Sequence, residues 1–161
     1  IKRSSTLFLQ AVIVLIGIVA LALMLLEPRL EGVNAHASLF QIYFSDPFLA
    51  YAYIGSIPFF VALFQALKLL GYIGQNKVFS QVAVNALKTI KYCAFITAGV
   101  IVAAIVYLRI TAFSSNEDPA GAVMLGNIAT FTSIVVGTAA AVFQKTLQNA
   151  VDIKSEHDLT V

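Results

Sequence analysis

Apolar residues gather in four long stretches that contain no Asp, Glu, Lys or Arg, at residues 4–26, 47–67, 92–108 and 119–144. About 20 helical residues cross the hydrocarbon core of a bilayer, and a chain in lipid must satisfy its backbone amides internally. Each stretch therefore predicts a membrane-spanning helix. Allowing for the flanking apolar turns, we place the spans at about 4–26, 47–70, 88–113 and 119–144.

The first stretch also has some features of a signal peptide. Lys2 and Arg3 precede it, and Ala35-His36-Ala37 resembles a cleavage site. However, the apolar run is longer than the core of a signal peptide, and the Ala-x-Ala sequence lies far beyond its end. We therefore expect a first span that is retained in the protein.

Basic residues are distributed unequally between the two sides of these spans. Eight lie on one side, namely Lys2, Arg3, Lys68, Lys77, Lys88, Lys91, Lys145 and Lys154. The other side carries only Arg29 and Arg109. Because cytoplasmic loops are enriched in Lys and Arg, both termini should be cytoplasmic, in a multi-pass membrane protein.

Local signals support these helix boundaries. Asp46-Pro47 and Asp118-Pro119 each combine a capping carboxylate with proline at the first helical position, and Ser80 can cap a helix that enters the third span. Gly55 and Pro58 predict a kink in the second span. We expect one all-α integral membrane domain over residues 1–161, a four-helix bundle in which helices three and four extend into the cytoplasm and residues 145–161 form a tail.

Composition narrows the chemistry further. Charged residues make up 11%, against about a quarter in ordinary globular proteins. The span interiors have no ionisable group except the Cys93 thiol and tyrosine phenols, which argues against a self-contained transporter. No phosphate-binding loop, metal-ligand spacing or nucleophile triad is present, so we expect a non-enzyme without cofactor or metal. The net charge of +2 also gives no sign of direct nucleic-acid binding.

Small residues recur at every fourth position of the fourth span, at Ala129, Ser133, Gly137 and Ala141. Such a stripe allows another helix backbone to approach closely, so we expect these residues to pack helices. The neighbouring helix belongs either to the same bundle or to a second copy or partner protein.

Two segments outside the spans carry more specific patterns. Phe79-Ser80, Leu87-Lys88 and Ile90 precede the third span, and the chain closes with Val142-Phe143, Ile153-Lys154, Glu156 and Asp158-Leu159-Thr160-Val161. These patterns resemble those of the DUF2975 family, small bacterial four-span membrane proteins of unknown function. The Asn usual in the first pattern is displaced, since Val84 stands near its place and Asn85 follows. The resemblance implies no catalytic residue. It also implies that the gene often lies next to a gene for a small helix-turn-helix regulator.

From this we expect a non-enzymatic, membrane-embedded regulatory or scaffold protein that binds a cytoplasmic partner, such as a small helix-turn-helix transcription regulator. The expected partner-binding residues are Lys77, Phe79, Ser80, Lys88, Lys91, Lys154, Glu156, Asp158 and Leu159. The alternative is a subunit of an oligomeric transporter or channel complex. The lipid bilayer and a second copy of the chain are further expected partners.

The tail should continue as helix after Gln144, with Leu147, Ala150, Val151 and Lys154 on one side. Its three acidic residues, Asp152, Glu156 and Asp158, are here called the tail acids. An anionic inner leaflet repels them, and acids near a helix C-terminus oppose the macrodipole. Three interpretations remain open: the tail folds back onto Lys77, Lys88 and Lys91, a basic soluble partner binds it, or it is simply solvated.

The charge distribution gives a direct test of topology. A reporter that is active only in the cytoplasm should work when fused to Val161 and fail when inserted at Asn34. Activity at Asn34 with none at Val161 would contradict the proposed orientation.

Overall fold

The computed structural model describes residues 3–30, 47–115 and 118–160, and the regular structure in these ranges is α-helical. The helices are α1 (Arg3–Leu30), α3 (Pro47–Gly55), α4 (Ile57–Gly74), α5 (Gln81–Ser115) and α6 (Ala120–Thr160). Four helical stretches are long and apolar enough to cross a membrane, at Ser4–Met24, Ala50–Gly74, Gln81–Phe113 and Ala120–Leu159. The prediction of an all-α protein with four potential spans is confirmed. The cap expected from Asp46 lies outside the described residues.

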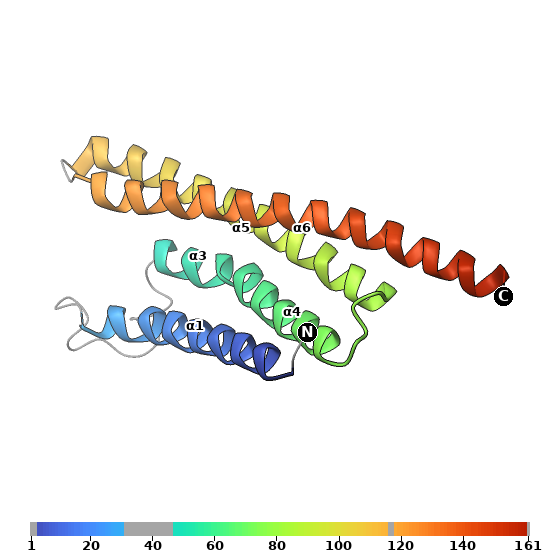
Figure 1. The fold of residues 1–161 in the computed structure, drawn as a ribbon. Coiled ribbons are helices and arrows are strands. Elements are labelled where there is room, and N and C mark those ends of the chain that lie inside the picture. The colour runs from blue at the N-terminus through green and yellow to red at the C-terminus, as the bar shows by residue number, and fades with distance from the viewer. Residues whose placement is uncertain (1–2, 31–46, 116–117, 161) are drawn as a thin grey trace.

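The helices lie side by side in chain order, with α1 against α4, α4 against α5, and α5 against α6 (Figure 1). The most extensive contact joins α5 and α6, whereas α1 and α6 share none of comparable extent. The arrangement is therefore an open row, and the predicted four-helix bundle is not confirmed. The start of α1, the α4–α5 connection and the end of α6 lie toward one end of the molecule (Figure 1). We call it the lysine-rich end, since Lys77, Lys88, Lys91, Lys145 and Lys154 belong to it.

Helix α5 forms the core because α4 and α6 both pack on it. Its most buried residues are small or β-branched and lie in its first half, at Ala83, Val84, Ala86, Ala94 and Ala98. Short side chains let two neighbouring helices approach α5 closely, which is how helices associate in lipid. The most buried residues of α5 therefore lie in the half of the helix that begins at the lysine-rich end.

Helix α1 is held to α4 by a smaller contact. Thr6 is buried, and a Cβ added to Gly74 would lie 3.2 Å from the Thr6 Cγ2 atom. Nearby, the Gln10 side-chain amide donates a hydrogen bond to the Leu67 carbonyl at 3.2 Å. A glycine contact and one polar bond thus fix the start of α1 on α4.

The second span is interrupted at Ser56, between α3 and α4. Pro58 has no N–H to donate to the Ile54 carbonyl, so one bond of the regular helical ladder is missing at this point. The Ser56 hydroxyl instead donates to the Tyr53 carbonyl at 2.7 Å. The helix assignment is interrupted at the position expected from Gly55 and Pro58, and the kink itself stays a prediction.

Two of the predicted N-caps are formed. The Asp118 carboxylate accepts the Ala120 N–H at 3.0 Å, and Pro119 stands beside it where no donor is needed. The Ser80 hydroxyl accepts the Ala83 N–H at 3.4 Å at the start of α5. These caps satisfy amides that a helix start leaves without an intrahelical partner.

The small residues of α6 lie toward α5. Gly137 is buried, and an added Cβ would meet the Phe95 ring of α5 at 2.9 Å. Gly126 makes a similar approach, since its Cβ would lie 2.9 Å from Ile105 side-chain atoms. The other members of the predicted stripe are partly buried, namely Ala129, Ser133 and Ala141. The stripe therefore packs within one copy of the chain, where α6 meets α5.

This packing gives a prediction with a matched control. Gly137→Leu should destabilise the α5–α6 pair by about 1–3 kcal/mol, because the new side chain must displace Phe95. Gly99→Leu on α5 is the control, since a Cβ there meets nothing within 4 Å. Thermal melting in detergent should show a lower Tm for Gly137→Leu alone. Equal Tm values for the two variants would contradict the close approach.

Candidate docking surface at the lysine-rich end

A tight turn ends α4 and directs the chain into α5. Asn76 adopts a left-handed conformation with φ 58°. The Asn76 N–H donates to the Ile73 carbonyl at 3.2 Å, and the Lys77 N–H donates to the Tyr72 carbonyl at 2.7 Å. This pair of bonds is a Schellman motif, with Asn at the position where glycine is usual. The turn places Phe79 and the Ser80 cap beside the end of α4.

An apolar groove of about 310 Å³ opens beside this turn. Its walls come from α4, the α4–α5 connection, α5 and α6, through Leu69, Ile73, Val78, Phe79, Leu87, Phe143, Thr146, Leu147 and Ala150. Thr146 is the only polar residue among them. Phe79 and Phe143 remain 54% and 62% exposed, so two aromatic rings stand at the groove with much of their surface uncovered.

A polar clasp fixes the first turns of the α6 tail to the start of α5. The side-chain amides of Gln81 and Gln148 bond each other reciprocally, with both donor–acceptor distances 3.1 Å. Gln81 also donates to the Asn85 side chain at 3.2 Å, and Gln148 donates to the Asp152 carboxylate at 2.9 Å. Residues on both helices are thereby oriented, and the groove wall formed by α6 is held in place.

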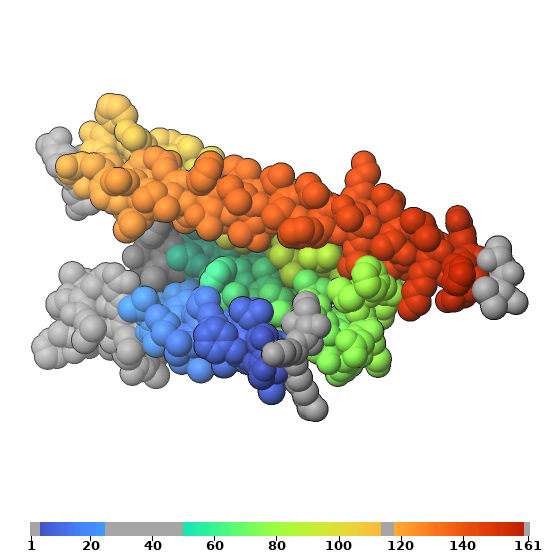
Figure 2. Space-filling model, in the orientation of Figure 1, coloured from blue at the N-terminus to red at the C-terminus, as the bar shows by residue number. Residues whose placement is uncertain are grey.

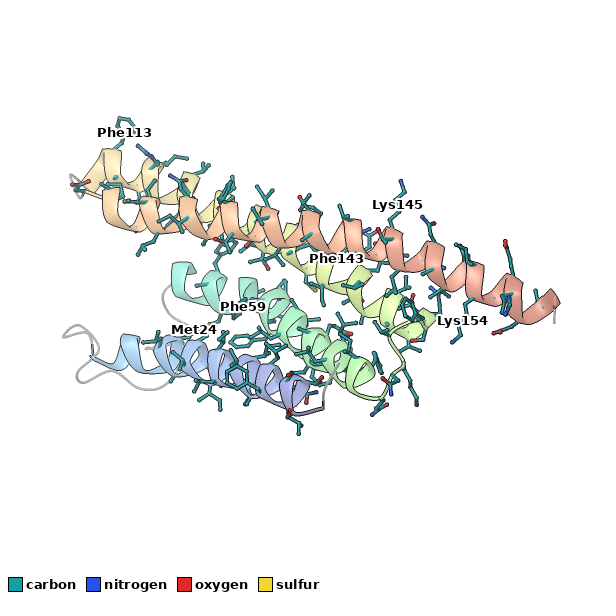
Figure 3. The ribbon with its side chains drawn as sticks, in the orientation of Figure 1. Met24, Phe59, Phe113, Phe143, Lys145 and Lys154 are labelled. Carbon is teal, nitrogen blue, oxygen red and sulfur yellow. The ribbon has the colours of Figure 1, made fainter. Side chains whose placement is uncertain are left out.

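Beyond this clasp α6 projects away from the other helices, and Lys154 lies on the projecting part (Figure 3). Ile153 is 66% exposed and Leu159 is 83% exposed. Glu156 and Asp158 are exposed as well. The tail is helical to Thr160, as predicted, but its apolar residues at the end contact little of the protein.

The structure does not support the fold-back interpretation of the tail. Lys77, Lys88, Lys91 and the tail acids all lie among the described residues, and the structure contains no ion pair between the two groups. The Lys91 ammonium instead lies 4.5 Å from the centroid of the Tyr92 ring. An extended helix keeps the acids away from these lysines, because helical hydrogen bonding holds the tail straight.

Comparison with known proteins gives a consistent assignment. The chain matches the family described as "Protein of unknown function (DUF2975)" over residues 31–161. It is 43% identical over 164 residues to the "Uncharacterized membrane protein YoaS" of Bacillus subtilis (strain 168), covering 99% of each chain. The chain belongs to the DUF2975 family. No solved structure matches it.

The part of this DUF2975 protein that matches the family includes every element that lines the groove. The resemblance inferred from two sequence patterns is thus confirmed. The structure brings both patterns together, since Phe79 and Leu87 of the first line the same groove as Phe143 of the second. Ser80 caps α5 and Lys77 closes the turn, whereas Lys88, Lys154, Glu156, Asp158 and Leu159 are exposed.

Several residues at this surface were missed from the sequence. Gln81 and Gln148 are 67 positions apart, and nothing in the pattern connects two ordinary polar residues over that distance. Leu69 and Ile73 belong to an apolar stretch in which every position would suit lipid. For metals, the described residues contain no group of three His, Cys, Asp or Glu placed to hold an ion. His36 lies outside those residues.

The clasp is open to a double-mutant test. Gln81→Ala and Gln148→Ala should each lower the protection of α6 amides near residue 148 against hydrogen exchange. The pair should show a coupling energy of about 0.5–1 kcal/mol, typical of a hydrogen bond in water. Asn149→Ala, an exposed neighbour outside the clasp, should leave protection unchanged. Strictly additive effects of the two glutamine substitutions would show that the side chains do not interact in solution.

Proposed function

We propose that this protein is a non-enzymatic docking protein of the bacterial cytoplasmic membrane, with both termini in the cytoplasm, that holds a basic soluble partner at the inner face. A small helix-turn-helix transcription regulator is the kind of partner expected. The supporting observation is that α6 alone carries both an apolar groove wall and an acidic, projecting end.

The groove supplies the apolar half of the docking surface. Lys91 and Lys145 mark the level at which the spans leave the hydrocarbon, since lysines favour the interface. Leu87 lies one helical turn outside Lys91, and Ala150 lies more than one turn outside Lys145. Leu69 and Phe143 lie at the edge of the predicted spans, so the groove extends from the edge of the hydrocarbon into the headgroups and water. Covering it with a partner's apolar side chains is therefore favourable.

The tail supplies the charged half. Three acids and one lysine occupy residues 152–158. The anionic leaflet and the helix macrodipole both disfavour acids here, and the structure contains no ion pair from Lys77, Lys88 or Lys91 to offset this. A basic partner would offset both effects. The exposed Ile153 and Leu159 would add apolar contacts beside the charges.

Charge reversal of the tail tests the proposal. Glu156→Lys combined with Asp158→Lys should leave membrane insertion and melting unchanged but abolish capture of the basic partner from detergent-solubilised membranes. Phe79→Ala combined with Phe143→Ala should weaken capture through loss of the aromatic anchors. The captured protein should bind DNA when released.

The matched control keeps the charge and exchanges the side-chain length. Glu156→Asp combined with Asp158→Glu should capture the partner at the strength of the natural chain. Capture of the same strength by the charge-reversed protein would show that the tail is not the docking element. Loss of capture in the charge-conserving control would assign the effect to tail structure instead of charge.

A second candidate function, a subunit of an oligomeric transporter or channel complex, is favoured by the break at Ser56. Interrupted membrane helices often flank the substrate sites of transporters. The span interiors offer no carboxylate or basic side chain, so other subunits would have to supply the polar groups of a pathway. The neighbouring genes distinguish the two candidate functions. A neighbouring regulator gene favours the docking protein, whereas neighbouring ATPase or permease genes favour the transporter subunit.

A further inference from the structure

A second cavity lies within the spans. Its lining residues on α5 and α6 are different from those that line the groove. Its volume is about 490 Å³, and α3, α4, α5 and α6 all contribute to its walls. On α5 its lining runs from Thr97 to Leu108, and Tyr51 and Phe59 of the second span line it as well. From Thr97 to Leu108 the cavity follows α5 over eleven residue steps, which is about 16 Å at 1.5 Å per step. The cavity is therefore elongated along the span direction.

The junction between α3 and α4 contributes to the wall of this cavity. Gly55 and Ser56, which end α3 and precede α4, belong to its wall, as does Gly126 of α6. The two glycines bring their helices close to α5, since a Cβ added to Gly55 would lie 2.5 Å from the Val100 side chain and one added to Gly126 would lie 2.9 Å from the Ile105 side chain. Figure 2 shows α3 and α4 set back between α6 and α1, so that the surface is hollowed along this side.

The lining of the cavity is almost entirely apolar. It contains no Asp, Glu, Lys, Arg or His, and its polar side chains are the hydroxyls of Tyr51, Ser56 and Thr97. Each hydroxyl proton is donated to a backbone carbonyl, of Val100 at 2.9 Å, Tyr53 at 2.7 Å and Cys93 at 2.7 Å, respectively. A polar solute would find no side-chain donor left to bind it and would lose its own bonds to water.

We propose that this cavity binds a linear acyl chain. It lies at hydrocarbon depth, between segments that are apolar enough to cross a membrane, so the surrounding solvent is itself acyl chain. Its volume falls within the range typical of small-molecule sites, which are mostly apolar with a few placed polar groups. The elongated shape suits an extended chain. A phospholipid and a free fatty acid both carry this chemistry.

Photoaffinity labelling tests the proposal on the full-length protein in lipid nanodiscs. One probe is a fatty acid with a diazirine in its chain, and the other is a phosphatidylcholine carrying the same chain. The natural chain and the three variants described below are labelled, and the modified peptides are quantified by mass spectrometry. Labelling by the first probe alone identifies a free fatty acid, and labelling by the second alone identifies a phospholipid.

Ala104→Phe fills the cavity from α5 and should reduce labelling of the peptides that contain Val100 and Leu125 about tenfold, equivalent to 1.4 kcal/mol of binding free energy. Ala103→Phe is the matched control, because Ala103 is an exposed neighbour on α5 that does not line the cavity. Ala122→Phe fills the same space from α6 and should act like Ala104→Phe, so that misfolding of one variant leaves the other as a test.

Melting in detergent verifies that each variant is folded. Reduced labelling in both cavity variants but not in Ala103→Phe supports the site. Equal labelling of all variants, or labelling spread evenly over the exposed faces of the spans, would mean that the probes report only the surrounding lipid and would overturn the proposal. Absence of label from the lining peptides with both probes would overturn it too.

Discussion

The close packing of α5 against its two neighbours is the interaction on which the rest of this structure depends. In lipid, burying apolar side chains gives little advantage over leaving them in acyl chains, so helices associate through close van der Waals contact. Small buried residues allow this contact on both helices. They are Ala83, Ala86, Ala94 and Ala98 on α5, and Gly137 and Ala140 on α6. Because α4 and α6 both use α5, they diverge on either side of it, and a groove and a cavity form between them.

The two spaces differ because packing changes along α5. Near the lysine-rich end its residues are almost fully buried, and the reciprocal Gln81–Gln148 pair fixes α6 to it. Toward the far end, the second span breaks at Ser56, and Tyr51 reaches α5 with a single hydrogen bond to the Val100 carbonyl. The apolar groove therefore lies beside the most buried part of α5. The far end keeps a space within the membrane region that only an apolar molecule suits.

Hydropathy and capping chemistry were enough to predict the spans, the Asp118 and Ser80 caps, and the interruption near Pro58, since each depends on residues close together in the sequence. The open row was not predictable in the same way. Spans such as Ser4–Met24 are apolar on all sides, so the pattern does not indicate which face meets a neighbour. The groove depends on that choice, because Ile73 and Ala150 are brought together only by the way α4 and α6 pack on α5.

Helix α6 connects the two proposed sites physically. Its 41 residues run without interruption for about 60 Å, past the membrane cavity at Gly126 and the groove at Phe143 to the projecting tail. A ligand at either site touches this one helix. Coupling would nevertheless require that α6 or its neighbours have two arrangements with different affinities. Around Ser56 the second span lacks one helical hydrogen bond, because Pro58 has no N–H, but the Ser56 N–H still donates to the Ala52 carbonyl at 3.0 Å and the Phe60 N–H donates to the Ser56 carbonyl at 3.1 Å. If an acyl chain changes the affinity for the partner by some factor, the partner must change the affinity for the acyl chain by the same factor.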